Sequence, residues 1–93
     1  MSIKINFYSL FRINLSSAGE EYNIKNHISV KELITKLDED YNNYFSNKMI
    51  ENNKIKKGSI ILINGKNILH LDGLQTTITD GDKIDLFPPS AGG

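Results

Sequence analysis

Residues 80–93 read Asp80-Gly81-Asp82-Lys83-Ile84-Asp85-Leu86-Phe87-Pro88-Pro89-Ser90-Ala91-Gly92-Gly93. The first three are turn-forming residue types, and apolar residues alternate with polar ones in the segment that follows. This segment, from Lys83 to Phe87, is predicted to be a β-strand. Two prolines end the strand, because proline lacks the N–H that a sheet ladder needs and fixes φ at about −65°.

The four residues after the prolines have small side chains. Ser90 carries a hydroxymethyl group and Ala91 a methyl group, whereas Gly92 and Gly93 have no side-chain carbon. A backbone without Cβ atoms fits a narrow channel and adopts positive φ without strain. The alternative is an ordinary frayed chain end. Because these residues follow a strand and two prolines directly, we favour a tail that acts in a partner's channel.

The composition fits one small soluble domain. A chain of 93 residues supports a single modest core, and we expect a domain over residues 1–87 with a flexible tail over residues 88–93. The formal net charge is zero, whereas binding to nucleic acid or to an anionic membrane favours a basic surface. We therefore expect neither nucleic acid nor a membrane as a partner. No apolar run approaches the roughly 20 residues of a membrane-spanning helix, so we expect a cytoplasmic protein.

The sequence contains no obvious catalytic or metal-binding motif. Cysteine is absent, which excludes disulfides, thiolate metal ligands and a cysteine nucleophile. His27 and His70 have no suitable partners nearby in sequence, and Asp80 and Asp82 lack the spacing of a calcium loop. We therefore expect neither a metal site nor an enzyme.

Two strands and one helix are predicted in the N-terminal half. Apolar residues alternate over residues 3–8 and again over residues 21–25, which is typical of half-buried strands. Ser29 and Glu32 have the spacing of a capping box, in which each side chain bonds the other residue's backbone N–H. A helix should therefore begin after Ser29 and end near Tyr44, with one apolar stripe that packs on a sheet.

Loops and further strands are predicted around this helix. Residues 10–19 contain turn-forming types and residues 46–58 are rich in Asn and Lys, so both are expected to be loops, the second with room for a short helical turn. Residues 60–63 are all apolar and end at Asn64-Gly65, which predicts a strand covered on both faces and a tight turn, with a return strand over residues 68–71. This order predicts an α+β fold with the helix on one face of a mixed sheet.

Several segments together resemble one family of ubiquitin-like proteins. They are Phe87-Pro88-Pro89 with Ala91-Gly92-Gly93, the preceding turn and strand from Asp80, the segment Ile63-Asn64-Gly65-Lys66, and the N-terminal residues from Ile3 to Arg12. These residues resemble the MoaD-like branch of the sulfur carriers, the small subunit of molybdopterin synthase. The resemblance implies the ubiquitin-like β-grasp fold, in which the first and last strands lie parallel at the centre of the sheet.

The resemblance also implies a reaction at the carboxylate of Gly93. A carboxylate is a poor electrophile, because its two oxygens share a negative charge, so a MoeB-like activating enzyme would use ATP to adenylate it. Sulfur from a sulfurtransferase would then form a thiocarboxylate. The tail, Ser90, Ala91, Gly92 and Gly93, would enter the active site of the larger, MoaE-like catalytic subunit and donate sulfur for molybdopterin, with no cofactor bound by this chain.

Alternation along the last strand predicts a partner interface. If Ile84 and Leu86 face the helix, Phe87 faces the other way, together with Tyr8 of the parallel first strand. Alternatively, Phe87 packs over the edge of the core. The single arginine has a fork geometry that suits carboxylates of a partner, although a surface ion pair is its commoner role. The predicted interface residues are Tyr8, Arg12, Leu62, Phe87, Pro88 and Pro89.

Two other functions remain open from the sequence. The chain could carry sulfur for another product, such as thiolated tRNA, or be a modifier that is joined to protein lysines. It could also be a β-grasp interaction module whose tail is merely flexible. The identity of the larger partner would separate the molybdopterin function from the other carrier functions, and sulfur in the terminal carboxyl group would exclude the interaction module.

Overall fold

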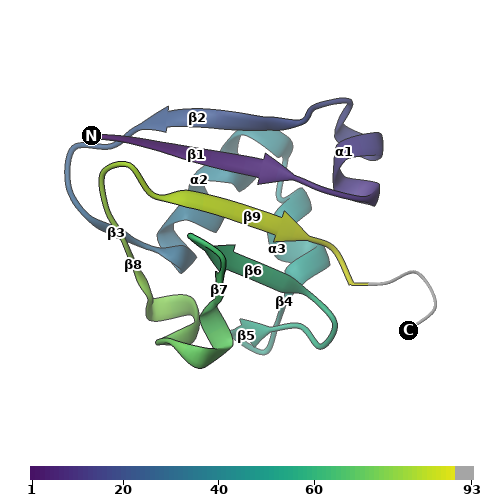
Figure 1. Ribbon diagram of the computed structural model, residues 1–93. Helices are drawn as coiled ribbons and strands as arrows, with labels where there is room; N and C mark the ends of the chain where they lie inside the picture. Colours follow the sequence, from purple (N-terminus) through teal and green to yellow (C-terminus); the bar gives the residue numbers. More distant parts are fainter. Residues whose placement is uncertain (90–93) are drawn as a thin grey trace.

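A computed structural model describes residues 1–89 of the chain. Helices cover one face of a five-stranded mixed sheet (Figure 1). The parallel pair lies at the centre, as predicted, and the other neighbours are antiparallel. The strand order is β2 (Gly19–Asn23), β1 (Ser2–Phe7), β9 (Lys83–Phe87), β6 (Ile60–Ile63) and β7 (Lys66–Asn67). The α+β, ubiquitin-like β-grasp fold is therefore confirmed.

The remaining elements are short, apart from the main helix. Within residues 1–89, no helix has the length and apolar character needed to cross a membrane. Two further pairs of strands, β3 (Ile28–Ser29) with β8 (Thr77–Ile78) and β4 (Ile50–Glu51) with β5 (Lys54–Ile55), form separate two-stranded ladders. The bounds of the helices and helical turns are α1 (Leu10–Leu15), α2 (Val30–Tyr41), α3 (Tyr44–Met49), η1 (Ile68–His70) and η2 (Gly73–Gln75).

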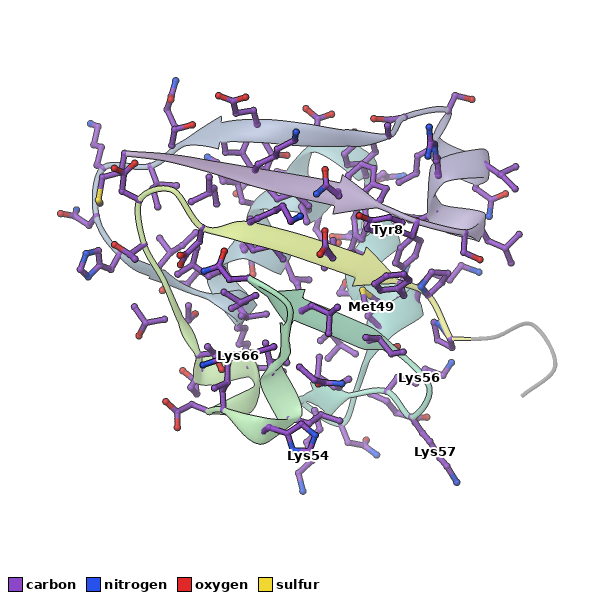
Figure 2. All side chains as sticks on the ribbon, in the orientation of Figure 1. Tyr8, Met49, Lys54, Lys56, Lys57 and Lys66 are labelled. Atoms are coloured by element: carbon purple, nitrogen blue, oxygen red, sulfur yellow. The ribbon has the colours of Figure 1, made fainter. Side chains whose placement is uncertain are left out.

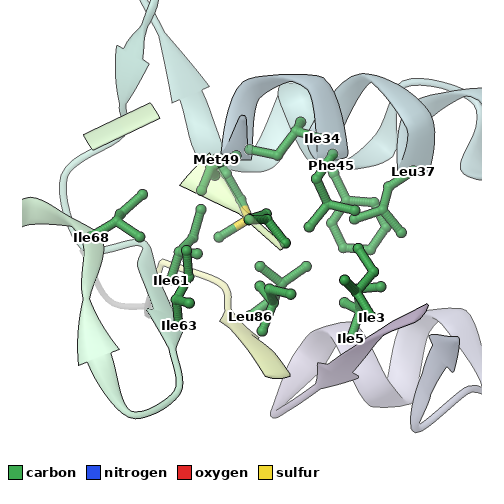
Figure 3. Close-up of a cluster of buried hydrophobic side chains, with 14 of the residues drawn as sticks. Ile3, Ile5, Ile34, Leu37, Phe45, Met49, Ile61, Ile63, Ile68 and Leu86 are labelled. Atoms are coloured by element: carbon green, nitrogen blue, oxygen red, sulfur yellow. The ribbon is translucent and has the colours of Figure 1, made fainter. Parts of the chain in front are cut away.

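The core lies between the sheet and the helices (Figure 3). In the central ladder, Ile5 is the register partner of Ile84, and Phe7 is the partner of Leu86. All four side chains are buried, and Phe7 also packs on Phe45, with ring centroids 5.2 Å apart. Alternation along the strands therefore directs one set of side chains into the core and leaves the other set on the opposite face.

The capping box at the start of α2 is confirmed. The backbone N–H of Glu32 donates to Ser29 Oγ at 3.0 Å, and the N–H of Ser29 donates to Glu32 Oε1 at 2.9 Å. These bonds satisfy two backbone donors that have no partner inside the helix. They fix the first residue of the helix at Val30, where the sequence predicted it.

The predicted end of this helix, near Tyr44, was wrong. Helix α2 ends at Tyr41, because Asn42 and Asn43 both adopt left-handed backbone conformations, with φ of 55° and 63°. Asparagine tolerates this conformation better than most residues. The Asp38 carboxylate then accepts hydrogen bonds from the first backbone N–H groups of α3, one of them from Phe45 at 3.1 Å. The end of the single predicted helix therefore belongs to a second helix, α3.

Both predicted loops contain regular structure instead. Residues 10–19 include α1, which buries Phe11, and residues 46–58 include most of α3 and the β4–β5 hairpin. These segments are too short to reveal a period. Phe11 and Met49 reach the core, whereas Leu10 and Ile13 are exposed. The return strand was predicted over residues 68–71, but β7 comes before them and they mostly form the turn η1. The strand over residues 60–63, predicted to be covered on both faces, is covered on one face only.

Truncating Met49 should destabilise the fold, because its side chain is fully buried at the end of α3. We expect Met49→Ala to lower the free energy of unfolding by roughly 2–5 kcal/mol, through lost burial and a cavity. Asn47→Ala, an exposed position of the same helix, is the control and should change it little. Urea unfolding of both variants measures the difference. Equal effects would contradict the packing of α3 described above.

Two phenol groups join the edge strand β2 to α2. Tyr22 donates to Asp40 Oδ2 at 2.5 Å, and Tyr41 donates to the carboxylate of Glu20. Burial raises the pKa of Tyr41 to about 12, with further contributions from the hydrogen bond and the charge of Glu20. The folded protein therefore favours the neutral, donating phenol.

This interaction should weaken in alkaline solution. Because the folded-state pKa of Tyr41 lies above the ordinary value of 10.0, its contribution is complete below about pH 10 and is lost towards pH 12. The difference in unfolding free energy between the wild type and Tyr41→Phe should accordingly be constant at neutral pH and shrink between those values. Urea unfolding at several pH values measures it. A difference that grows with pH would contradict the assignment.

Candidate functional site

The sheet face opposite the helices carries half of the predicted interface residues, Tyr8, Leu62 and Phe87. We call this surface the open face; its residues are Lys4, Asn6, Tyr8, Ile60, Leu62, Lys83, Asp85 and Phe87. Figure 2 shows Tyr8 in front of the sheet, at the end of β9. Tyr8, Leu62 and Phe87 therefore lie on one face of the sheet, as alternation along the strands predicted.

Tyr8 and Phe87 form a stacked aromatic pair at one end of the open face. Their ring centroids are 4.5 Å apart and their planes differ by 9°. Phe87 is half-buried, neither fully exposed as predicted nor part of the core. The stack covers one side of its ring, because Tyr8 N–H donates to Leu86 O at 3.2 Å and so continues the β1–β9 ladder by one residue. Ile60, opposite Phe87 in the register, is exposed.

An aspartate to which no role was assigned from the sequence, Asp85, lies at the centre of this face. Asp85 is only 7% exposed. Its Oδ1 accepts hydrogen bonds from Asn6 Nδ2 at 2.9 Å and from Tyr8 Oη at 3.3 Å. Burial raises the pKa of Tyr8, and the Asp85 carboxylate adds to this, whereas the positive charge of Arg12 opposes it. A charged residue in the middle of a central strand was the available signal.

Of the other predicted interface residues, Leu62 lies on the open face and the rest lie elsewhere. Leu62 is half-buried and opposite Asp85 in the register. Arg12 is exposed on α1, a helix where the sequence predicted a loop. Pro88 and Pro89 are half-buried and line a surface hollow of about 300 Å³ together with Leu10, Asn14, Tyr44, Lys48 and Lys56. The first two residues of the predicted tail therefore contact the domain.

The predicted reactive segment lies beyond these residues. Ser90, Ala91, Gly92 and Gly93 are outside the described part of the chain. Within residues 1–89, His, Cys, Asp and Glu side chains do not gather in groups of three or more that could hold a metal ion. The site as described is an aromatic and charged surface next to the root of the tail, suited to binding a macromolecule.

The fold and this surface define a small ubiquitin-like protein of the class that comprises sulfur carriers and protein modifiers. Residues 10–93 match the ThiS family, and the chain belongs to that family. Small archaeal modifier protein 3 from Haloferax volcanii is 29% identical over 93 residues, with complete coverage of both chains. Members of this class are small carrier proteins.

Solved structures agree with this fold. The solution structure of the Haloferax volcanii HVO 2177 protein is 29% identical, with a TM-score of 0.83, and the match covers 100% of this chain and 87% of that one. A putative molybdopterin converting factor, subunit 1, from Pyrococcus furiosus is 20% identical, with a TM-score of 0.75 and coverage of 97% and 99%. At this second level of identity the likeness shows the fold alone.

Replacing Phe87 by Ala should leave the domain folded. Phe87 contributes a stacked ring on the open face, so we expect a small loss of unfolding free energy, whereas Phe7→Ala, in the core, should cost roughly 3–5 kcal/mol. Urea unfolding of the two variants compares them. If Phe87→Ala is as damaging as Phe7→Ala, the half-buried position of Phe87 has been misassigned.

Proposed function

We propose that this chain is a sulfur carrier whose terminal carboxyl group, on Gly93, is adenylated and converted to a thiocarboxylate. The supporting observation is that the match to the ThiS family extends to residue 93. It therefore includes the segment that follows Phe87, where the central strand β9 ends. A rigid central strand followed by two prolines holds the root of the tail at a fixed place on the domain. The four small residues beyond it suit a narrow active-site channel.

The sulfur acceptor in this proposal is the precursor of molybdopterin, with the chain as the small subunit of molybdopterin synthase. An activating enzyme of the MoeB type binds ATP and adenylates Gly93, a sulfurtransferase is the indirect source of sulfur, and a MoaE-like subunit holds the catalytic groups. The chain itself binds no cofactor and is not an enzyme. These steps take place in the cytoplasm, where ATP is available.

The same partners are proposed to dock on the open face and around the root of the tail. The aromatic pair of Tyr8 and Phe87 presents an apolar surface, with Leu62 and Ile60 beside it and Pro88, Pro89 and Arg12 towards the tail. Aromatic side chains are frequent anchors of such interfaces. A folded Phe87→Ala variant is expected to bind its partner roughly 30- to 1000-fold more weakly.

Conjugation to protein lysines is a second candidate function. It is favoured by one observation: the relative that matches over its entire length is named a small archaeal modifier protein. Both functions begin with an adenylated Gly93. They differ in the attacking group, which is sulfur in a carrier and the amine of a lysine in a modifier. The two outcomes differ in mass and can be separated directly.

Shortening or extending the tail by one residue should abolish sulfur loading and leave the fold intact. The full chain, a chain without Gly93 and a chain with one added residue are incubated with the activating enzyme, ATP and a sulfur donor. Intact-mass analysis detects replacement of oxygen by sulfur, and circular dichroism checks folding. Thiocarboxylation of the chain without Gly93 would contradict the proposal. Lysine adducts of the wild type, found in native extract without any thiocarboxylate, would favour the modifier.

A further inference from the structure

The open face has three rows of side chains with different charge. The first row contains Lys4 and Lys83, the second Asn6, Asp85 and Leu62, and the third Tyr8, Phe87 and Ile60. Adjacent rows are two residues apart along the strands, which is about 6.6 Å. The surface therefore changes from cationic to anionic to aromatic over a short distance.

The carboxylate of Asp85 is the chemically unusual member of this surface. It is more than nine-tenths buried by its neighbours, and its hydrogen bonds from the described residues both go to Oδ1. The donors, an amide and a phenol, are neutral. A carboxylate offers about four acceptor positions on two oxygens, so Oδ2 has capacity for a further donor. Lys4 and Lys83 lie one row away, and both are exposed.

A partner that covers the open face would remove the remaining water from this carboxylate. Burial of a carboxylate without a compensating charge is strongly unfavourable. Docking on this face is therefore more favourable when the partner brings a cationic donor to Asp85 Oδ2. A partner without such a donor would bind more weakly, so Asp85 would make the open face selective for particular partners.

The neighbouring row indicates which cation fits. The stacked rings of Tyr8 and Phe87 lie directly beside Asp85, and Tyr8 Oη is hydrogen-bonded to it. A guanidinium group bonds a carboxylate through its planar N–H groups and packs against aromatic rings, whereas an ammonium group is compact and strongly hydrated. The combination of carboxylate and aromatic pair suits arginine.

We propose that Asp85 is a specificity-determining residue of the docking surface, and that it accepts an arginine side chain of the activating enzyme beside the Tyr8–Phe87 pair. This inference rests on the proposed function, because it takes the open face as the surface that the activating enzyme covers. It adds the chemistry of the contact: acidic groups opposite Lys4 and Lys83, arginine opposite Asp85, and apolar groups opposite the aromatic pair.

The test compares Asp85→Asn with the wild type in the thiocarboxylation reaction with full-length chains. Asn keeps the shape and an acceptor oxygen but removes the charge. We expect KM for the chain to rise roughly 10- to 150-fold, as for the loss of a charged hydrogen bond, with kcat little changed and with a weaker dependence of KM on salt. Glu39→Gln is the matched control, because it removes the same charge from the exposed surface of α2.

A second measurement identifies the partner's group. The activating enzyme is treated with phenylglyoxal, which modifies arginine, in the presence of excess wild-type chain or excess Asp85→Asn, and modified sites are mapped by mass spectrometry. The wild type should protect one arginine that the variant leaves reactive. Asp85→Ala serves as a second charge-removing variant, and thermal unfolding checks that each variant is folded.

The outcomes separate the two proposals. If the wild type acquires sulfur but Asp85→Asn has the KM of the wild type or a lower one, the inference about Asp85 is wrong and the proposed function stands. Equal effects of Glu39→Gln and Asp85→Asn, or equal protection of the activating enzyme's arginines by the wild type and by Asp85→Asn, would also overturn the inference. If the wild type acquires no sulfur from the activating enzyme, the proposed function fails, and the inference fails with it.

Discussion

The parallel ladder between β1 and β9 determines where everything else lies. It joins the two ends of the described chain, with Lys4 beside Lys83 and Phe7 beside Leu86. Parallel neighbours cannot be joined by a tight turn, so the residues between them must cross over and return. Helices α2 and α3, which lie in this crossing segment, bury their apolar side chains on the inward residues of the ladder.

The same ladder produces the open face. Each strand that buries Ile5 or Leu86 must direct its alternate residues to the other side, and the helices cover only one side of the sheet (Figure 1). Pro88 and Pro89 directly follow the last residue of β9, so the open face and the root of the tail are joined through one central strand. A partner bound to the open face, as proposed, would therefore also lie close to Pro88 and Pro89.

In the proposed complex, charge on the open face gives the activating enzyme a means of choosing between carriers that share a fold. Proteins with 20–29% identity to this chain keep the β-grasp architecture, so the architecture alone does not discriminate between them. Discrimination needs groups whose burial is unfavourable in the wrong complex. Asp85 is such a group here, because its carboxylate is nearly buried before any partner arrives and its hydrogen-bond donors are neutral.

The sequence by itself determined the elements whose signals are local. Alternation fixed β1 and β9, the capping box fixed the start of α2, and Asn64-Gly65 fixed a turn. Only the tertiary structure decided the rest. Helix α3 depends on hydrogen bonds to Asp38 of the neighbouring helix α2, and Met49 is buried in the core. Asp85 accepts hydrogen bonds from Asn6 and Tyr8, which are 79 and 77 residues away in the sequence. The spacing of apolar residues indicates which way a side chain points, whereas its burial and its partners depend on segments that only folding brings together.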